Sequence, residues 1–389
     1  MAQGANAIRR QKTVRTMSDP QKLSAPVPPG GTIGILGGGQ LARMLALAAA
    51  RLGLKTHVFS DVRDAPAFQV TSAHTYASYR NAEALRKFAQ AVDVITFEFE
   101  NVPSESIDTL SLLKPVRPNA RSLAITQERF EEKSFVSSLG IATAAFAPVN
   151  SAAEARAAFG KISSQRAVLK TRRLGYDGKG QAMVSSPEQA VAAFEAFREV
   201  PCILEAFVTF DFEASIVAVR GSDGTFAAYD PPENEHGDHI LRRSIVPSRL
   251  SAARVEEARE IARKVGDALD YVGTFCVELF VTADGLLVNE IAPRVHNSGH
   301  WIIDACAASQ FENHIRAVAG WPLASTERHS NAVMENLIGE DARNWQSVVR
   351  RGGCLHLYGK SEIRDGRKMG HITWVKPRSA RRPNQKTSD

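Results

Sequence analysis

Short β-branched runs alternate with helical stretches over roughly the first hundred residues after Gly30. Strands are predicted at 33–36, 56–60 and 92–97, with helices at 40–52 and 82–89 between them. Because strands that alternate with helices pair in parallel, this pattern predicts an open parallel α/β domain over residues 30–130. A chain of 389 residues is too long for one core, so further domains are expected after it.

The next region, residues 131–320, again mixes strands and helices. The predicted helices are 130–139, a Ser151-capped helix ended by Gly160, 187–197, 252–269 and 310–319, and the strands are 167–171, 202–208, 212–220, 272–281 and 286–291. A shorter β-rich region is predicted at 321–375. The fold class is therefore α/β (α+β) in several domains.

The positive charge of the chain is confined to its ends. Residues 1–29 and 376–389 each carry a net charge of +4, whereas the whole chain carries +6, so residues 30–375 carry −2. A nucleic-acid enzyme needs a basic groove on its folded body, so this function is disfavoured. Both ends lack aromatic residues almost entirely and are predicted to be disordered tails. A mitochondrial-type presequence, or a start at Met17, is a further explanation of the first tail.

Two other observations bear on location. No apolar run reaches the 18 residues of a membrane span, and the N-terminus lacks the apolar stretch of a secretory signal. The four cysteines are scattered without metal-ligand spacing, which is typical of buried thiols in a reducing compartment. We therefore expect a cytoplasmic protein with no membrane partner.

A glycine-rich turn follows the first predicted strand. Residues 37–42 match G-x-G-x-x-A, and Asp61 ends the next strand where a ribose-binding acid belongs in dinucleotide-binding proteins. The same backbone would accept any phosphate at a helix N-terminus, or form a tight turn without ligand. A nicotinamide oxidoreductase is therefore an alternative, but it leaves the acidic features downstream unexplained.

Two glutamates are predicted to face each other across a hairpin. With a one-residue bulge at Asp284-Gly285, Glu278 and Glu290 become cross-strand partners with carboxylates roughly 5 Å apart. Two such anions need a cation between them, and Mg²⁺ with phosphate oxygens suits such a pair. A solvated hairpin face is the alternative, which the nearby Arg294 and His296 disfavour.

A flexible segment suited to phosphates lies upstream. Residues 175–181, which we call the flap, hold three glycines and one lysine directly after a strand that ends near Lys170. Residues 205–208 end a strand that would offer backbone groups to an adenine edge, and Glu213 would reach a ribose. The Walker pattern G-x-x-x-x-G-K-[ST] is absent.

Together these residues resemble the ATP-grasp ligases, and within them the N5-carboxyaminoimidazole ribonucleotide synthases, from Gly34 to Trp374. The resemblance implies an ATP-grasp fold with a small mobile lid at about 140–207. It rests on residues 37–44 (GGGQLARM), 96–102 (TFEFENV), 175–181 (GYDGKGQ), 289–294 (NEIAPR), 296–300 (HNSGH), 358–360 (YGK) and 367–371 (RKMGH).

The resemblance also implies roles for individual residues. The ATP site would comprise Arg129, Lys170, Gly175, Tyr176, Asp177, Gly178, Lys179, Gly180, Gln181, Glu205, Ala206, Phe207, Val208, Glu213, His236, Asn289 and Glu290. Mg²⁺ would bind Glu278 and Glu290. The catalytic residues would be Tyr176, Asp177, Arg294, His296 and Asn297, and the ribonucleotide would contact Gly39, Gln40, Leu41, Glu98, Asn101, Lys360 and Arg367. Four positions depart from the family pattern and affect the expected loop geometry around these residues: Leu174, Ala42, Val295 and Ala292.

The implied reaction joins bicarbonate to the amine of 5-aminoimidazole ribonucleotide at the expense of ATP. Bicarbonate would first become carboxyphosphate, and Asp177 or His296 would take the amine proton. Another ATP-grasp ligase, such as a formate-dependent glycinamide ribonucleotide transformylase or a biotin carboxylase, shares the ATP half and is the main alternative. The family also implies a homodimer.

Overall fold

Four parallel strands in the order β3-β2-β1-β4 form the sheet of the N-terminal domain. The structure is a computed structural model and describes residues 21, 23, 25–162, 165–175 and 179–378. The strands are β1 (Thr32–Leu36), β2 (Lys55–Ser60), β3 (Ala73–Tyr76) and β4 (Val94–Phe97), and the helices are α1 (Gln40–Arg51), η1 (Pro66–Gln69), α2 (Ala82–Gln90), α3 (Ser104–Ser111) and α4 (Ala120–Thr126). The predicted parallel α/β domain is confirmed, although β3, α3 and α4 were not foreseen.

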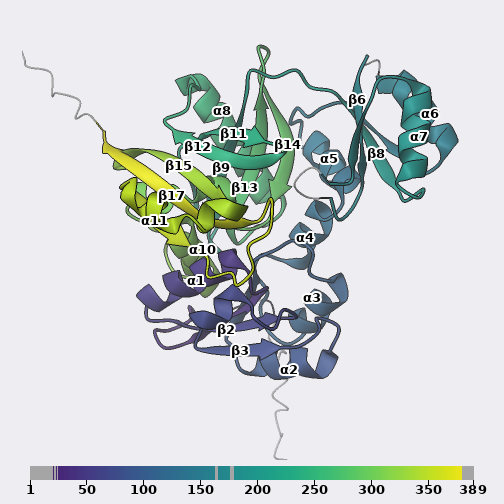
Figure 1. Ribbon diagram of the computed structural model, residues 1–389. Helices are drawn as coiled ribbons and strands as arrows, with labels where there is room; N and C mark the ends of the chain where they lie inside the picture. The colour runs from purple at the N-terminus through teal and green to yellow at the C-terminus, as the bar shows by residue number, and fades with distance from the viewer. Residues whose placement is uncertain (1–20, 22, 24, 163–164, 176–178, 379–389) are drawn as a thin grey trace, which may run out of the picture.

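A small antiparallel sheet lies to one side of the molecule, with α6 and α7 on its outer face (Figure 1). Its order is β5-β8-β6-β7, and α5 (Arg129–Ser138) precedes it. The elements are β5 (Phe146–Val149), α6 (Ala152–Ile162), β6 (Ala167–Thr171), β7 (Gln181–Val184), α7 (Pro187–Ala196) and β8 (Cys202–Ala206). They fall within residues 140–207, which we call the lid. Gly160 does not end α6, because one glycine weakens a helix by only about 1 kcal/mol and α7 packs against it.

The third sheet has nine strands and runs from the middle of the chain to its C-terminal region. Its order is β14-β13-β9-β11-β12-β15-β17-β16, with β10 beside β9. The strands are β9 (Phe212–Arg220), β10 (Phe226–Ala228), β11 (Glu233–Gly237), β12 (Ile240–Val246), β13 (Gly273–Val281), β14 (Leu286–Ala292), β15 (Ser330–Ile338), β16 (Cys354–Leu357) and β17 (Lys368–Pro377). The helical elements are α8 (Ala252–Ala268), η2 (Asn297–Gly299), α9 (Ile302–Ala305), α10 (Gln310–Ala319), η3 (Gly339–Ala342) and α11 (Trp345–Arg350). The predicted β-rich region 321–375 thus extends this sheet, because β15 pairs with β12.

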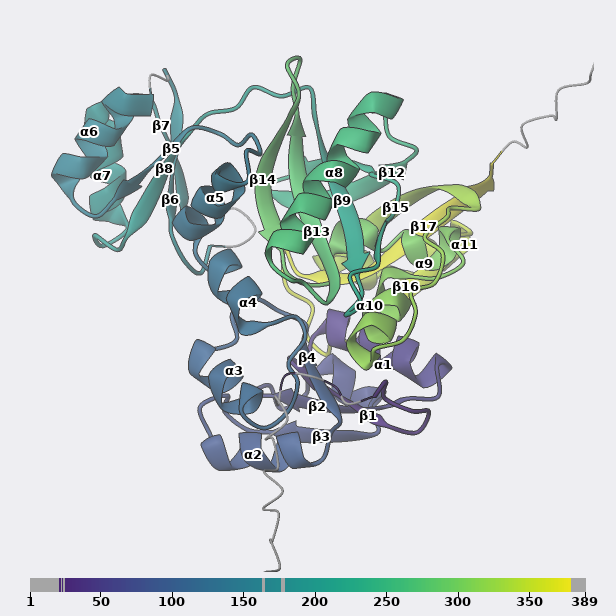
Figure 2. The same ribbon diagram turned by 180° about the vertical axis from the view of Figure 1, so that it is seen from behind.

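Helix α10 joins the N-terminal domain to the nine-stranded sheet, as seen from behind in Figure 2. Phe311 and Ile315 share one buried cluster with residues of α1 and β1. His314, also on α10, accepts a hydrogen bond at Nδ1 from the backbone N–H of Thr274 (3.0 Å), and its Nε2 lies 2.8 Å from Thr96 Oγ1. The two parts are therefore held together by both apolar and polar contacts.

Residues on both sides of the predicted tail boundaries contact the folded body. Val27 is buried, its N–H donates to Ala319 O (2.9 Å), and its carbonyl accepts from Trp321 Nε1 (2.7 Å). At the other end β17 runs to Pro377, and Arg378 donates to Arg328 O (2.9 Å). The boundaries at 30 and 375 are corrected accordingly, because backbone and side-chain contacts continue beyond them. Residues 1–20 and 379–389 lie outside the described residues.

No helix in the described part of the chain is long and apolar enough to cross a membrane.

Candidate active site

A cavity of about 1210 Å³ lies between the N-terminal domain, the lid and the hairpin β13–β14. The predicted site residues that line it are Gln40, Leu41, Glu98, Asn101, Arg129, Lys170, Gly175, Lys179, Gln181, Glu205, Ala206, Phe207, Val208, Glu213, His236, Glu278, Asn289, Glu290, Arg294, His296 and Asn297. Gly39, Gly180, Lys360 and Arg367 do not line it. Tyr176, Asp177 and Gly178 lie outside the described residues. Most of the predicted site therefore converges on one cleft, whose parts come from all three sheets.

Glu278 and Glu290 are direct cross-strand partners, as the spacing argument requires. The bulge is not at Asp284-Gly285 but at Asn289, because Leu279 pairs with Val288 while Glu278 pairs with Glu290. The turn itself is tight: the Thr282 N–H donates to Gly285 O at 2.9 Å. The turn therefore needs no extra residue, and the bulge lies further along β14, at Asn289, which lines the cleft. Bulges are common next to active sites.

Each glutamate contacts a cation of the protein. Glu278 Oε1 lies 2.9 Å from His296 Nε2, and Glu290 Oε2 lies 3.2 Å from Arg129 Nη1. Burial alone would raise the pKa of Glu278, but the hydrogen bond and charge of His296 and the charge of His236 lower it to about 2. Burial would likewise lower the pKa of His296, yet Cys276 and Glu278 raise it to about 10. The hairpin therefore presents two carboxylates of which Glu278 is fixed in its ionised form.

Helix α5 places Arg129 between the hairpin and the start of the flap. Glu128 caps this helix by accepting from the N–H groups of Phe130 (3.0 Å) and Glu131 (3.2 Å), and it forms a bidentate pair with Arg172 at 2.7 and 2.6 Å. Arg129 then donates to Glu290 and, at 3.3 Å, to Gly175 O. One guanidinium thus connects a proposed metal ligand to Gly175, the first residue of the flap.

A buried cation–anion cluster lies where the lid meets the cleft. Glu205 Oε2 is 3.0 Å from Lys170 Nζ and 3.5 Å from Lys133 Nζ, and these charges lower the pKa of Glu205 to about 2 although burial would raise it. Glu205 Oε1 is buried and has no hydrogen-bond partner among the described residues. A buried carboxylate oxygen without a donor is costly, so this atom fits an N–H or O–H donor of a ligand. Lys133 was not predicted, because it lies within a helix without any motif of its own.

The glycine-rich turn holds a carboxylate of the chain itself. Glu98 Oε1 accepts from the Gly39 N–H at 2.7 Å, and Glu98 Oε2 accepts from the Ala42 N–H at 3.3 Å. A Cβ at Gly37 would lie 2.3 Å from Glu98 Cγ, and one at Gly39 would lie 2.7 Å from Glu98 Oε1. The glycines therefore make room for Glu98 at the N-terminus of α1. This arrangement removes the argument for a dinucleotide, because the amides that would bind its pyrophosphate are already occupied.

Arg294 is fixed by Glu100, a glutamate that the sequence analysis did not select. Its Nε donates to Glu100 Oε2 at 2.5 Å, and its Nη2 donates to Glu100 Oε1 at 3.2 Å. Burial would raise the pKa of Glu100, but the Arg294 charge lowers it. Glu100 lies two residues after Glu98 in the motif at residues 96–102. This spacing of two acids after a strand was the sequence feature from which a role for Glu100 could have been predicted.

The neighbouring polar residues are held in the same way. His296 Nδ1 lies 2.9 Å from Ser298 Oγ, so both ring nitrogens of His296 have partners. Asn297 exchanges two amide hydrogen bonds with Asn336 of β15, at 2.9 and 2.8 Å. Glu213 Oε2 lies 2.6 Å from His236 Nδ1. The cleft therefore has pre-positioned side chains on the walls that the nine-stranded sheet supplies.

Two residues predicted to contact the ribonucleotide, Lys360 and Arg367, lie outside the cleft lining. Lys360 Nζ donates to Lys368 O at 2.5 Å, and Arg367 donates to Glu362 O at 2.7 Å. Lys368, which the sequence analysis passed over, lines the cleft, and its charge helps to lower the pKa of Glu278. Lys368 is the first residue of β17. Because successive side chains of a strand point to opposite faces, the side chain of Lys368 points away from those of the residues before and after it.

Three family models that match successive parts of the chain between residues 31 and 384 agree with one another. Residues 31–127 match the ribonucleotide synthetase preATP-grasp domain, residues 134–311 the ATP-grasp domain, and residues 332–384 the phosphoribosylaminoimidazole carboxylase C-terminal domain. An N5-carboxyaminoimidazole ribonucleotide synthase of Brucella melitensis is 50% identical over 355 residues, which cover 90% of this chain and 98% of that protein.

Solved structures agree with this result. An N5-carboxyaminoimidazole ribonucleotide synthetase in complex with ADP is 39% identical, with a TM-score of 0.87 over 91% of this chain and 94% of the other. The Aspergillus clavatus enzyme, in complex with ADP and 5-aminoimidazole ribonucleotide, is 30% identical, with a TM-score of 0.83 over 90% and 94% of the two chains.

Proposed function

Because this chain belongs to the N5-carboxyaminoimidazole ribonucleotide synthases, we propose that it couples ATP cleavage to carboxylation of 5-aminoimidazole ribonucleotide in purine biosynthesis. The observation that carries the proposal is the single cleft in which the Glu278–Glu290 pair, the Lys170–Glu205 cluster and the Glu98–Glu100 wall meet. The related enzyme with bound ADP and 5-aminoimidazole ribonucleotide supports the same pairing of ligands. Products would be N5-carboxyaminoimidazole ribonucleotide, ADP and phosphate.

The reaction needs two bond-forming steps. A bicarbonate oxygen attacks the γ-phosphorus of ATP, ADP leaves, and carboxyphosphate forms. The exocyclic amine of the ribonucleotide then attacks the carboxyl carbon, phosphate leaves, and the amine loses a proton. Carboxyphosphate hydrolyses readily, so exclusion of water by the lid and flap is part of catalysis.

The ATP half of the cleft belongs to the lid. Lys170 supplies positive charge for phosphate oxygens, and its ammonium is held by Glu205 at 3.0 Å. The unpartnered Glu205 Oε1 is placed to accept a donor of the nucleotide, beside residues 206–208. Arg129 would couple nucleotide binding to the flap, because it already contacts Gly175 O.

The residues present fit a magnesium ion. Glu278 and Glu290 offer oxygen ligands from directly opposite strand positions, which is the ligand chemistry that Mg²⁺ prefers alongside phosphates. When bound, the ion would neutralise charge on the transferred phosphoryl group. His296 and Arg129 keep the two carboxylates oriented.

Arg294 suits the bicarbonate anion through its planar guanidinium, and Glu100 fixes its plane. Glu98, Gln40 and Asn101 line the opposite wall, where the ribonucleotide would lie. His296 could act as the base only by giving up Glu278 or Ser298, since both nitrogens are engaged. These contacts disfavour His296 as the base; Asp177, the other candidate, lies outside the described residues.

The direct test measures phosphate release from ATP with Mg²⁺, with and without bicarbonate and 5-aminoimidazole ribonucleotide. Release that requires both co-substrates is expected. A control replaces the ribonucleotide with glycinamide ribonucleotide plus formate, and another uses biotin. Stimulation by either control at the level of aminoimidazole ribonucleotide would overturn the assignment in favour of a different ATP-grasp ligase.

The assembly and location belong to the proposal as well. A homodimer is the state expected from the resemblance, and light scattering of the purified full chain would test it. A cytoplasmic location agrees with the cysteines, which are all free thiols and of which Cys202, Cys276 and Cys306 are buried. Fractionation of the cells that make the protein would test that location.

A further inference from the structure

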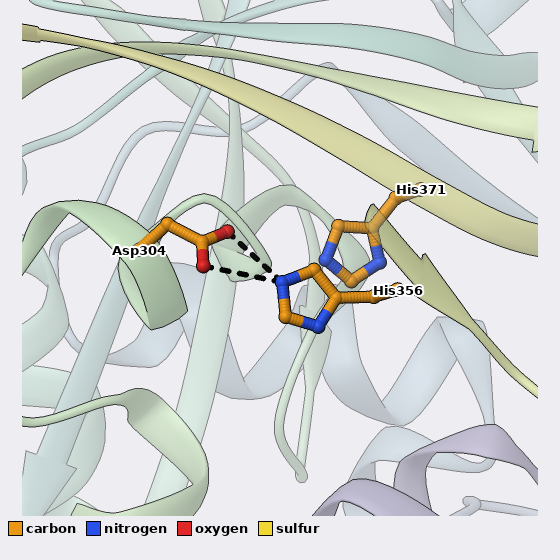
Figure 3. Close-up of side chains that lie close together, drawn as sticks. All are labelled: Asp304, His356 and His371. Atoms are coloured by element: carbon orange, nitrogen blue, oxygen red, sulfur yellow. Dashed lines mark hydrogen bonds and ion pairs between the residues drawn. The ribbon is translucent and has the colours of Figure 1, made fainter. Parts of the chain in front are cut away.

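A second cluster of metal-ligating side chains lies outside the cleft. Asp304 on α9, His356 on β16 and His371 on β17 have ligand atoms that all lie within 4.8 Å of one another (Figure 3). His356 Nε2 is 3.0 Å from Asp304 Oδ2, and the two imidazole rings are stacked with centroids 4.5 Å apart. None of the three lines the ATP cleft.

His371 has a nitrogen with no protein partner. The residue is fully buried, and Nε2 has no hydrogen-bond partner among the described residues, whereas Nδ1 lies 2.9 Å from Tyr358 Oη. Figure 3 shows the ring directing its other nitrogen toward the Asp304–His356 pair. A buried imidazole nitrogen without a partner is unfavourable unless a ligand takes it, and a hydrogen bond at Nδ1 is the usual way in which a metal-binding histidine is oriented.

A thiol stands next to the cluster. Cys354 lies two residues before His356 on β16, so the two side chains share one face of the strand. The Cys354 side chain forms a hydrogen bond with the Asp304 side chain. Cys354 is therefore within reach of the same carboxylate that His356 contacts.

We propose that Asp304, His356 and His371 bind one divalent transition-metal ion of the Zn²⁺ type, with the Cys354 thiolate available as a fourth ligand. Two imidazoles, a carboxylate and a thiolate are common zinc ligands. Tetrahedral bonds of 2.0–2.1 Å place ligand atoms about 3.3 Å apart, which the His356–Asp304 pair already approaches at 3.0 Å. Closing the largest separation from 4.8 Å to about 3.3 Å requires the Asp304–His356 pair to move by up to about 1.5 Å toward the buried His371. This pair is the more accessible side, because the His356 side chain is 29% exposed.

The ion would tie α9 to the β16–β17 hairpin. Asp304 and His356 are 52 residues apart in the chain and form an ion pair, and α9 also packs against β17. Tyr358, which positions His371, begins the turn that leads to Lys360. Metal binding would therefore stabilise the C-terminal part of the large sheet. This inference does not depend on the proposed reaction.

The test titrates the full chain with Zn²⁺ and, separately, Co²⁺ in the presence of saturating Mg²⁺ and ADP, so that the cleft is occupied. We expect one tightly bound ion per chain by elemental analysis after gel filtration, a higher melting temperature, and the visible bands of four-coordinate Co²⁺. Loss of the thiolate-to-Co²⁺ absorption in Cys354→Ser would assign the fourth ligand.

Two ligand variants and one control decide the outcome. Asp304→Asn and His356→Gln, which lie at partly exposed positions, should weaken metal affinity by at least about 10-fold. His74→Gln, an exposed histidine on β3, should bind as the wild type does. Absence of stoichiometric binding by the folded wild type, or equal affinity in the wild type and both ligand variants, would overturn the proposal.

Discussion

Glu290 is the residue for which the structure sharpens the chemical prediction most. Glu290→Gln removes one of two facing carboxylates but keeps its size, so kcat for substrate-stimulated phosphate release should fall about 10²-fold. Its side chain is 39% exposed and Arg129 keeps other acceptors, so the melting temperature should hardly change. The assay is a Mg²⁺ titration of phosphate release with melting curves in EDTA.

Glu195→Gln, an exposed glutamate on α7, is the matched control and should behave as the wild type. Glu278→Gln should also lose phosphoryl transfer, and it additionally leaves His296 without its carboxylate partner. Near-wild-type kcat at low Mg²⁺ in both Glu278→Gln and Glu290→Gln would place the metal site elsewhere.

Lys133 provides a second prediction at this scale, because its side chain is only 2% exposed. Its ammonium donates to Thr143 Oγ1 (2.8 Å) and Val288 O (3.1 Å) and faces Glu205. Lys133→Met should lower the free energy of unfolding by about 2 kcal/mol, because buried acceptors at Thr143 and Val288 lose this donor, although Glu205 keeps Lys170 as its cation. Urea unfolding would measure it, with exposed Lys161→Met as the control. An unchanged midpoint in Lys133→Met would show that the cluster is not structural.

At the scale of elements, helix α10 carries a pH-sensitive contact. Burial lowers the pKa of His314 to about 3, so the folded protein keeps this imidazole neutral between Thr274 and Thr96. Its stabilising contribution is complete above the unfolded pKa near 6.5 and is lost as pH falls toward 3. The expected slope is about 1.4 kcal/mol per pH unit in that window.

The measurement compares unfolding free energies from pH 7.5 to pH 4.5 in the wild type and His314→Gln. The difference between the two proteins should shrink as the pH falls. His329→Gln, at an exposed position, should follow the wild-type curve. A difference that stays constant over the window would contradict the neutral, buried state of His314.

Elements with strong local patterns could be predicted, and those that depend on tertiary contacts could not. Helix α10 begins and ends where the sequence places it, because Ser309 caps it and Gly320 adopts φ = 76° after it. Strand β11, by contrast, is polar and carries a bulge between Glu235 and His236, so it depends on pairing with its neighbours β9 and β12. The bulge at Asn289 could not be predicted from the local sequence either, because the turn sequence is compatible with a bulge at Asp284-Gly285 or at Asn289.

The same limit applies to the site. Arg294, Glu278 and Glu290 follow from spacing and motif, and the cleft brings them together. Glu132 does not: its pKa is raised to about 8 by burial and by Glu290, yet nothing around it in the sequence marks it. Residues that act through a partner far along the chain need the fold before they can be recognised.

At the scale of the whole molecule, the ends of the chain give a prediction. A variant spanning residues 21–378 should have the same melting temperature as the full chain, whereas the melting temperature of a variant spanning residues 30–375 should be a few degrees lower. The shorter form loses the buried Val27, worth about 2 kcal/mol, and the Arg378 contact. Differential scanning calorimetry of both forms would measure this. Equal melting temperatures would show that residues 21–29 and 376–378 add nothing to the body.

The nine-stranded sheet crosses the boundary between two regions that sequence comparison treats separately. Residues 134–311 and 332–384 match different family models, yet β12 of the first is hydrogen-bonded to β15 of the second. Strands paired within one sheet tend to open together in native-state hydrogen exchange. The regions that match separate family models are therefore not the units that should open cooperatively. We expect β15, β16 and β17 to acquire amide protection only together with the strands of the β13–β14 hairpin.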